Sequence, residues 1–397
     1  MLLPSEATES HPALRGVPDT SGSFTLSRPW RPAWAEVDLN AVRHNVGLLA
    51  RLVSPAGLMA VVKADGYGHG AAQVAAAARR GGAAGLCVAL VKEGLVLRDA
   101  GLDCPILVLS EQPPDELADA IRAGLELTVY SHQQLEAIAA AGGDDHPVHL
   151  KIDTGMRRVG ADVDDAVGLA DAIEASSATR LAGVCTHLAV ADEPDDPFNG
   201  EQLETFGRVM LSLTLAGHHP SMVHAANSAA ALAIPAARLD VVRVGIAMYG
   251  ISPGHHVDGV VESLRPALSL HARVAHVKRV RAGDRISYGL QHRFDGDSTV
   301  ATLPLGYADG VPRRLFAGGG QVLIDGRRRP IVGVVTMDQM MVACGDDAVA
   351  IGDEAVLIGS QGGDSISATD WADRLGTIGY EVVCGISGRV DRRYTES

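Results

Sequence analysis

A lysine stands where an apolar run gives way to a glycine-rich turn. In the stretch GLMAVVKADGYGHG the run ends at Val62, Lys63 follows directly, and Gly66 begins a series of closely spaced glycines. A buried strand that ends in this way presents its amine at a rim, where the amine can meet a ligand or extend into water. In the first case Lys63 is a candidate nucleophile toward a carbonyl compound.

Other side chains that could bind a ligand or take part in catalysis follow later apolar runs in the same way. They are Lys151 and Asp153, then Arg158 in the next loop, His187, Asn227 and Ser228, and finally Arg243 and Gly245. The stretches HAANSAA and VGIA supply hydroxyls, small residues and accessible backbone N–H groups, which suit a phosphate. A lysine opposite a phosphate site suggests pyridoxal 5'-phosphate (PLP), because the aldehyde of PLP forms an imine with lysine.

The elements that must position these residues can be read from the hydrophobic pattern. Eight short apolar or β-branched runs begin near positions 58, 85, 105, 127, 148, 181, 222 and 241. The segments between them are rich in Ala, Leu, Glu and Arg, with apolar residues three or four positions apart, as in helices. Eight strand–helix alternations predict an α/β fold, a (β/α)₈ TIM-like barrel over residues 38–264, whose site lies at the carboxyl ends of the strands.

The pattern changes after about residue 265. Alternating segments such as QVLIDGRRRPIVGVV, with a hairpin signal at Asp325-Gly326, predict a β-rich C-terminal domain over residues 265–397. Residues 29–37 also alternate, and we expect them to add a strand to that domain. Residues 1–28 are rich in Pro, Ser, Thr and Gly and lack the features of a secretory signal, so a disordered tail is expected there.

Composition narrows the class of function. The 397 residues carry a formal net charge of -14, which opposes binding to nucleic acid or to anionic lipid. No apolar run approaches the 18 or so residues of a membrane helix. The five cysteines are widely spaced and form no CxxC pair, so the sequence indicates neither a disulfide framework nor a metal site. A cytoplasmic protein with a small-molecule substrate fits these features.

Nine separated motifs, in order, give the chain a family resemblance. They are AVVKADGYGHG, KIDTGM, THLA, HAANSAA, VRVGIAMYG, ISYG, LGYADG, MDQMMV and GYE. Over about residues 33–393 the chain resembles the alanine racemases, PLP enzymes built from a barrel and a β domain. The resemblance implies a homodimer with shared active sites that interconverts L-alanine and D-alanine, supplying D-alanine for peptidoglycan.

The resemblance also implies roles for individual residues. Lys63 would hold PLP and act as the base on one face of the substrate, while Tyr288 would act on the other face from the second subunit. Arg243 would face the pyridine nitrogen, and a guanidinium keeps its proton, so the ring would remain a weak electron sink. The other cofactor-binding residues implied are Tyr67, His187, Asn227, Ser228, Gly245, Ile246 and Tyr380, with His224 in support. Arg158, Met337 and Asp338 would bind substrate, and Lys151 would be carbamylated.

Several positions depart from the family pattern. Arg157 stands where glycine is usual, Leu290, Gln291 and His292 follow ISYG, and Asp391 replaces a common proline. These changes bear on substrate entry and on dimer packing.

Alternatives remain open at this point. Lys151 can be an ordinary lysine paired with Asp153 or with another carboxylate. The protein can be a racemase of another amino acid, such as serine, or a PLP-binding protein without turnover. The C-terminal motifs around Tyr288 and Met337 argue against the last alternative.

Overall fold

Eight parallel strands form the largest sheet of the computed structural model, which describes residues 31–254 and 263–396. The strand order is β8-β7-β6-β5-β4-β3-β2-β9. Asp240 N–H donates to Val223 O at 3.1 Å and Arg243 N–H donates to Ala226 O at 2.9 Å, so hydrogen bonds also connect the two end strands. The strands are β2 (Gly57–Val61), β3 (Gly85–Val88), β4 (Ile106–Val108), β5 (Glu126–Val129), β6 (His146–Lys151), β7 (Thr179–Cys185), β8 (Met222–His224) and β9 (Val241–Val244). The predicted barrel is confirmed.

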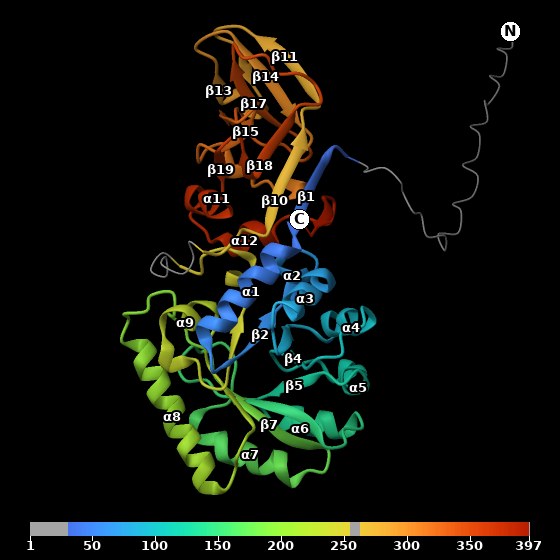
Figure 1. Ribbon diagram of the computed structural model, residues 1–397, viewed down its shortest axis with the longest axis vertical. Helices are drawn as coiled ribbons and strands as arrows, with labels where there is room; N and C mark the ends of the chain where they lie inside the picture. Colours follow the sequence, from blue (N-terminus) through green and yellow to red (C-terminus); the bar gives the residue numbers. More distant parts are fainter. Residues whose placement is uncertain (1–30, 255–262, 397) are drawn as a thin grey trace, which may run out of the picture. The chain divides into compact units, whose positions relative to one another are not determined.

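Helices alternate with these strands and cover the outside of the sheet (Figure 1). The longer ones are α1 (Leu39–Val53), α3 (Ala71–Arg80), α4 (Val91–Asp99), α5 (Pro114–Arg122), α6 (His132–Ala140), α7 (Ala166–Ala175) and α8 (Phe198–Ala216). The start of α1 shows how the sequence sets a boundary. The Asp38 carboxylate accepts hydrogen bonds from Asn40 N–H and Ala41 N–H, and it thereby caps the helix. Val42, Val46 and Leu49, spaced three or four apart, are then fully buried.

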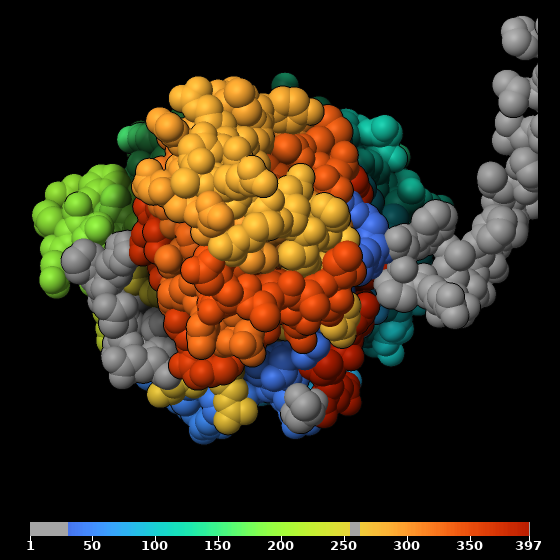
Figure 2. Space-filling view, turned by 90° about the horizontal axis from the view of Figure 1, so that it is seen from above, coloured from blue at the N-terminus to red at the C-terminus, as the bar shows by residue number. Residues whose placement is uncertain are grey.

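The remaining strands form the C-terminal sheets. The main one has the order β16-β15-β18-β10-β1-β20, with β19 paired to β18; a second has the order β11-β14-β17, and β12 pairs with β13. Their bounds are β10 (Leu268–Arg273), β11 (His276–Val280), β12 (Arg285–Ile286), β13 (His292–Arg293), β14 (Ser298–Leu303), β15 (Gln321–Ile324), β16 (Arg327–Pro330), β17 (Met340–Gly345), β18 (Glu354–Gln361), β19 (Asp364–Ile366) and β20 (Asp391–Thr395). In Figure 2 the part of the chain that forms β10 to β19, coloured amber to red, faces the reader.

Strand β1 (Ala33–Asp38), although it comes first in the sequence, belongs to the main C-terminal sheet. It lies between β10, to which it is antiparallel, and β20, to which it is parallel. Residues 1–28, for which we expected a tail, lie outside the described residues. Within the described ranges, no helix has the length and apolar character needed to cross a bilayer.

The expected hairpin at Asp325-Gly326 is present. Ile324 pairs with Arg327, so two residues form the turn between β15 and β16. Asp325 has φ 53° and Gly326 has φ 68°, the left-handed pair that a tight hairpin needs. After β19 the chain forms α11 (Ala368–Leu375) and α12 (Gly379–Cys384), and α12 contributes to the site described next.

Candidate active site

A cavity of about 750 Å³ lies at the carboxyl ends of the barrel strands. It gathers many of the side chains that the sequence analysis selected: Lys63, Tyr67, Lys151, Arg158, His187, Asn227, Ser228, Arg243, Gly245, Ile246 and Tyr380. Further lining residues come from strand ends, among them Ser110, Thr128 and Thr186, and from the C-terminal part, Ile378, Glu381 and Cys384. The barrel and α12 therefore both form the wall.

Lys63 is held by an unusual backbone turn. It begins the short segment α2 (Lys63–Tyr67), in which Ala64 and Asp65 both have φ 52°. A left-handed conformation costs about 1–2 kcal/mol for a residue with a side chain. Two carboxylates offset that cost: Glu93 accepts a hydrogen bond from Ala64 N–H at 2.7 Å, and Asp65 accepts one from Ala71 N–H at 2.8 Å. The turn is thereby fixed beside the cavity.

The cavity is rich in positive charge. Lys63, Lys151, Arg158 and Arg243 line it, whereas Glu381 is the single carboxylate among its lining residues. Burial lowers the pKa of Lys63, and the charge of Arg158 lowers it further. Burial likewise lowers the pKa of Lys151, with further contributions from Arg243 and Arg158. A cavity of this kind favours an anionic ligand.

Arg243 is locked in place by its neighbours. Its guanidinium donates to Thr186 O at 2.8 Å, to Ala225 O at 3.0 Å, and to Nδ1 of both His187 and His224. Burial, followed by the charge of Arg243, lowers the pKa of His187 and of His224 well below the usual value. Both imidazoles are therefore neutral at physiological pH and accept hydrogen bonds from the guanidinium.

A chain of buried side chains leads away from Arg243 through the barrel. Nε2 of His224 lies 2.9 Å from Nδ1 of His149, and Nε2 of His149 lies 3.1 Å from Oε2 of Glu126. Because a guanidinium can only donate, Nδ1 of His224 must accept and its Nε2 must carry the proton. The same logic makes His149 donate to Glu126. The tautomer of each ring is thereby assigned from its hydrogen bonds.

A group of small polar residues lies at one end of the cavity. Gly245 N–H donates to Ser228 Oγ at 2.9 Å. A Cβ on Gly245 would lie 2.5 Å from the Tyr67 hydroxyl oxygen, so a larger residue there would displace the Tyr67 side chain. Burial raises the pKa of Tyr67, which keeps its phenol protonated and able to donate. The ring of Tyr380 is 6.1 Å from that of Tyr67, and Asn227 caps the helix α9 (Ser228–Ala233) by accepting from Ala230 N–H.

Tyr288 lies outside the cavity. It is 72% exposed, on a one-turn segment between β12 and β13. Ser287, with φ 65°, donates from Oγ to Val334 O at 2.7 Å and so fixes the turn that presents the phenol. Met337 is 51% exposed, and the Asp338 side chain is 53% exposed. Within one chain, these three residues are not among those that line the cavity with Lys63.

The two adjacent arginines differ in position. Both are exposed, but Arg158 lines the cavity and Arg157 does not. Arg157 has φ 60°, a conformation that glycine adopts without strain. Asp153 accepts hydrogen bonds from Gly155 N–H and Arg157 N–H through Oδ1. Within the described ranges, no ion pair joins Lys151 to a carboxylate.

Sequence reasoning missed two groups that organise the site. Glu93 binds Ala64 N–H and also Ala89 N–H, and so it connects the ends of two neighbouring strands. His149 lies two positions before Lys151 in the stretch VHLKID, so the alternation of a strand directs both side chains to the barrel interior. That periodicity was the available signal for His149. Glu93 offered only its place three residues after a helix N-cap.

Comparison with known families agrees with this geometry. The family profile described as alanine racemase, N-terminal domain, matches residues 37–253, and the profile described as alanine racemase, C-terminal domain, matches residues 267–394.

Individual relatives cover nearly the whole chain. An alanine racemase from Symbiobacterium thermophilum is 48% identical over 368 residues, which are 92% of this chain and 97% of the relative. One from Thermobifida fusca is 45% identical, with 91% and 98% covered. Among solved structures, alanine racemase from the D-cycloserine producer Streptomyces lavendulae has a TM-score of 0.87 at 38% identity, with 92% and 98% covered. Alanine racemase from Bacillus anthracis with bound L-Ala-P also has a TM-score of 0.87, at 41% identity, with 92% and 95% covered.

Proposed function

The chain belongs to the alanine racemase family, and we infer that it is an enzyme that interconverts L-alanine and D-alanine with PLP as cofactor. The observation that carries this inference is the cation-lined cavity in which Lys63 lies with the Ser228–Gly245 group. D-Alanine is a component of peptidoglycan, and supplying it is the usual role of the family.

The residues present fit PLP. When bound, PLP supplies an aldehyde that bonds to Nζ of Lys63 and a ring that acidifies the Cα–H of the substrate. Ser228, Gly245, Ile246, Tyr67 and Tyr380 would bind the phosphate. The close approach of the Tyr67 hydroxyl to Gly245 supports this assignment.

Arg243 would bind the ring nitrogen, and His187 would lie beside the ring. His224 and Asn227 would support them. The guanidinium of Arg243 donates without surrendering its proton, so it orients the ring and leaves the nitrogen unprotonated.

Racemisation needs one proton acceptor on each face of Cα, because the proton leaves one face and returns to the other. The amine of Lys63 has a lowered pKa, so it becomes a neutral base more readily than an ordinary lysine. We assign it one face and assign the phenol of Tyr288 the other. Tyr288 would reach the cavity from a second copy of the chain, since its exposure leaves it available for such a contact.

The same reasoning supports a homodimer with shared sites. Met337 and Asp338 are exposed like Tyr288 and would enter the same neighbouring cavity. There they would contact the substrate carboxylate together with Arg158, whose guanidinium can bind a carboxylate through two hydrogen bonds.

Lys151 would be carbamylated. Its pKa is lowered mainly by burial, which increases the fraction of neutral amine that can attack carbon dioxide, with loss of a proton from the nitrogen. The carbamate would be an anion among the cations of the cavity and would hold Arg158 by charge-assisted hydrogen bonds. The alternative of a pair with Asp153 receives no support from the contacts, because Asp153 binds backbone N–H groups of its own loop.

Alanine is the preferred substrate, because the Tyr380 ring lines the cavity and limits the room for a larger side chain. Racemisation of another amino acid such as serine is the second candidate. A cytoplasmic location suits the five cysteines, all of which are free thiols.

Incubation of the purified protein and PLP with L-alanine, L-serine and L-lysine, followed by chiral analysis, tests the function. We expect D-alanine to form fastest. Borohydride reduction and peptide mapping should place the cofactor on Lys63. Absence of D-alanine, or cofactor fixed on another lysine, would overturn the proposal.

A further inference from the structure

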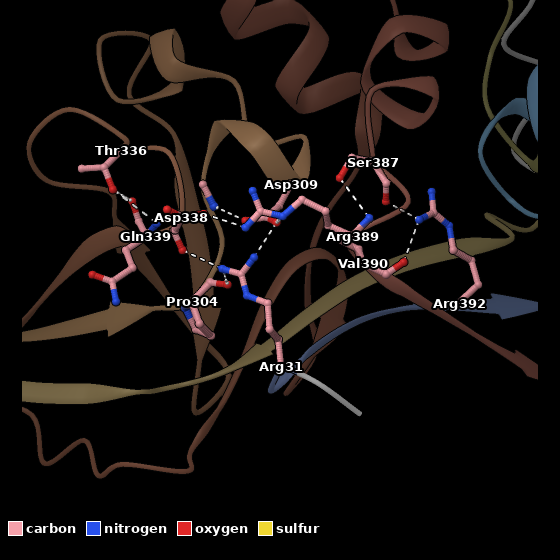
Figure 3. Close-up of polar contacts among 11 residues, drawn as sticks. Arg31, Pro304, Asp309, Thr336, Asp338, Gln339, Ser387, Arg389, Val390 and Arg392 are labelled. Atoms are coloured by element: carbon pink, nitrogen blue, oxygen red, sulfur yellow. Dashed lines mark hydrogen bonds and ion pairs between the residues drawn. The ribbon is translucent and has the colours of Figure 1, made fainter. Parts of the chain in front are cut away.

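The loop Thr336–Gln339 carries Met337 and Asp338, the two residues that the proposed function directs to the substrate carboxylate. A polar cluster outside the cavity holds this loop. We call it the Asp309 cluster; it consists of Arg31, Asp309, Asp338 and Arg389 (Figure 3). No residue of the cluster other than Asp338 has a role in the proposed reaction.

Asp309 is the buried centre of the cluster. Its side chain is 0% exposed and accepts hydrogen bonds from Arg31 at 2.6 Å and from Gly306 N–H at 2.9 Å, while Nε of Arg389 lies 3.3 Å from Oδ1. Arg389 extends its other end to Asp338, where Nη2 donates to Oδ1 at 2.6 Å. Arg31 donates to the main-chain oxygen of Asp338 at 2.8 Å. Two arginines therefore connect one buried carboxylate to both the backbone and the side chain of Asp338.

The backbone of the loop also packs closely against the segment that carries Asp309. Tyr307 N–H donates to Thr336 O and Ala308 N–H donates to Met337 O, each at 3.0 Å. A Cβ on Gly306 would lie 2.3 Å from Thr336 O, so only glycine permits this approach. The loop is therefore fixed against the segment that carries Asp309, and the one part of Asp338 left to be oriented is its carboxylate, which Arg389 binds.

The segment that bears Arg389 is also bound to the backbone turn at residues 63–68 of the same chain, which begins with Lys63. Arg392 donates to Gly68 O at 3.0 Å and also to the main-chain oxygens of Ile386, Ser387 and Val390. Arg389 therefore projects toward Asp338 from a rigid base (Figure 3).

Charge gives the contact between Arg389 and Asp338 a second purpose. The substrate carboxylate is an anion, and an unpaired Asp338 carboxylate beside it would repel it. Arg389 offsets the charge of Asp338 and fixes its direction. Because Arg31 also neutralises Asp309, removal of Arg389 would not leave that buried carboxylate without a cation.

We propose that Arg389 is a positioning residue that orients and neutralises Asp338 for substrate binding in the active site of the partner subunit. This inference rests on the proposed function, specifically on the shared active site. It predicts an effect on substrate binding that acts across the dimer, although Arg389 itself touches no substrate.

Steady-state kinetics of variants give the first test. We expect Arg389→Gln to raise the KM for alanine about tenfold with a smaller change in kcat, and Arg389→Lys, which keeps the charge, to recover most of the loss. Arg328→Gln is the matched control, because Arg328 forms another exposed arginine–aspartate pair, with Asp364 at 2.8 Å. Its further partners, Gln321 and Ser365, do not belong to the Asp309 cluster. An unchanged KM in Arg389→Gln, or an equal rise in Arg328→Gln, would overturn the proposal. Inactivity of the wild-type enzyme would instead refute the proposed function.

Hybrid dimers, isolated with two affinity tags, test the direction of the effect. A Lys63→Ala chain paired with an Arg389→Gln chain keeps one working cavity, which is completed by an intact loop, and should show the wild-type KM. A chain with both substitutions, paired with a wild-type chain, should show the raised KM. The reverse pattern would place the effect of Arg389 in its own cavity and would refute action across the dimer. Thermal melting of every variant separates these results from loss of folding.

Discussion

Nε2 of His224 lies 2.9 Å from Nδ1 of His149 inside the barrel. This contact connects Arg243, which binds the other side of His224, to residues nearer the opposite ends of the strands. Glu126, the first residue of β5, completes the chain by accepting from His149. Burial alone would raise the pKa of Glu126, but the hydrogen bond from His149 lowers it overall. An ionised Glu126 therefore fixes the tautomers on which the orientation of Arg243 depends.

Removing the acceptor at position 126 should slow the enzyme from a distance. In Glu126→Ala the N–H of His149 loses its partner, and a hydrogen bond worth about 1 kcal/mol corresponds to roughly a fivefold fall in kcat. Glu126→Gln still offers an oxygen and should lose less. Measurement of kcat in both directions checks this. A Glu126→Ala variant with full kcat would show that the hydrogen bonds from Glu126 through His149 and His224 have no influence on the site.

Tyr288→Phe should act on one direction of proton abstraction. Loss of a positioned base costs about 10²–10⁴-fold. We expect that loss for deuterium exchange into L-alanine and a much smaller one for D-alanine, because Lys63 serves the other face. Exchange from the two enantiomers is followed by NMR in deuterated water. Equal losses for both would argue that Tyr288 is not a face-specific base.

Lys151 should carry a carbamate. Protein equilibrated with ¹³C-bicarbonate should show a carbamate carbon signal that is missing from Lys151→Ala. The variant should lose activity and regain part of it with small carboxylates or chloride, since the site needs the negative charge near Arg158. A wild-type protein that lacks the signal would refute the modification.

His69 should make the protein sensitive to acid. Burial lowers the pKa of His69 to about 4, so between that pH and the usual value the unfolded chain binds a proton that the folded chain does not. Stability then falls as the pH is lowered, by about 2 kcal/mol from this group between pH 7 and pH 5. His69→Phe keeps the ring contact with Tyr249 and should reduce the fall by that amount. Urea unfolding of the apoprotein at both pH values measures it, and identical pH dependence of the two proteins would contradict it.

At position 157, glycine should give a more stable protein than alanine. The φ of 60° at Arg157 costs about 1–2 kcal/mol in a residue with a Cβ, and the greater entropy of unfolded glycine offsets about 0.5–1 kcal/mol of the relief. Arg157→Gly should therefore be more stable than Arg157→Ala by about 0.5–1 kcal/mol, since both lose the guanidinium and only one relieves the strain. Thermal and urea unfolding compare the pair, and a more stable Ala variant would refute the argument.

The barrel and the composition of its cavity could be predicted from the sequence for a physical reason. Strands buried on both faces read as continuous apolar runs, so the run near position 105 marked β4 and the run near 241 marked β9. Their carboxyl ends converge in any barrel, which brought Lys63 and Arg243 together without further information. The roles of individual site residues and the domain limits at 38–264 and 265–397 stay predictions.

Long-range polar partners were beyond that reasoning. Arg31 and Asp309 are 278 residues apart, and nothing in the local pattern of either residue indicates the other. The left-handed turn at Ala64 and Asp65 was equally hidden, because neither residue is one that favours that conformation strongly enough to predict it. Such features depend on tertiary contacts, here those of Glu93 and of the C-terminal segments.

The position of β1 has a consequence for the order in which a newly made chain can fold. Most barrel strands pair with the next strand in the sequence, β2 pairs in addition with β9, and all these strands lie within residues 57–244. β1 is made first, yet its partners β10 and β20 begin only at Leu268 and Asp391. On the ribosome the barrel can therefore form before the partners of β1 have been synthesised. During that time the unpaired edges of β1 need protection from other strands.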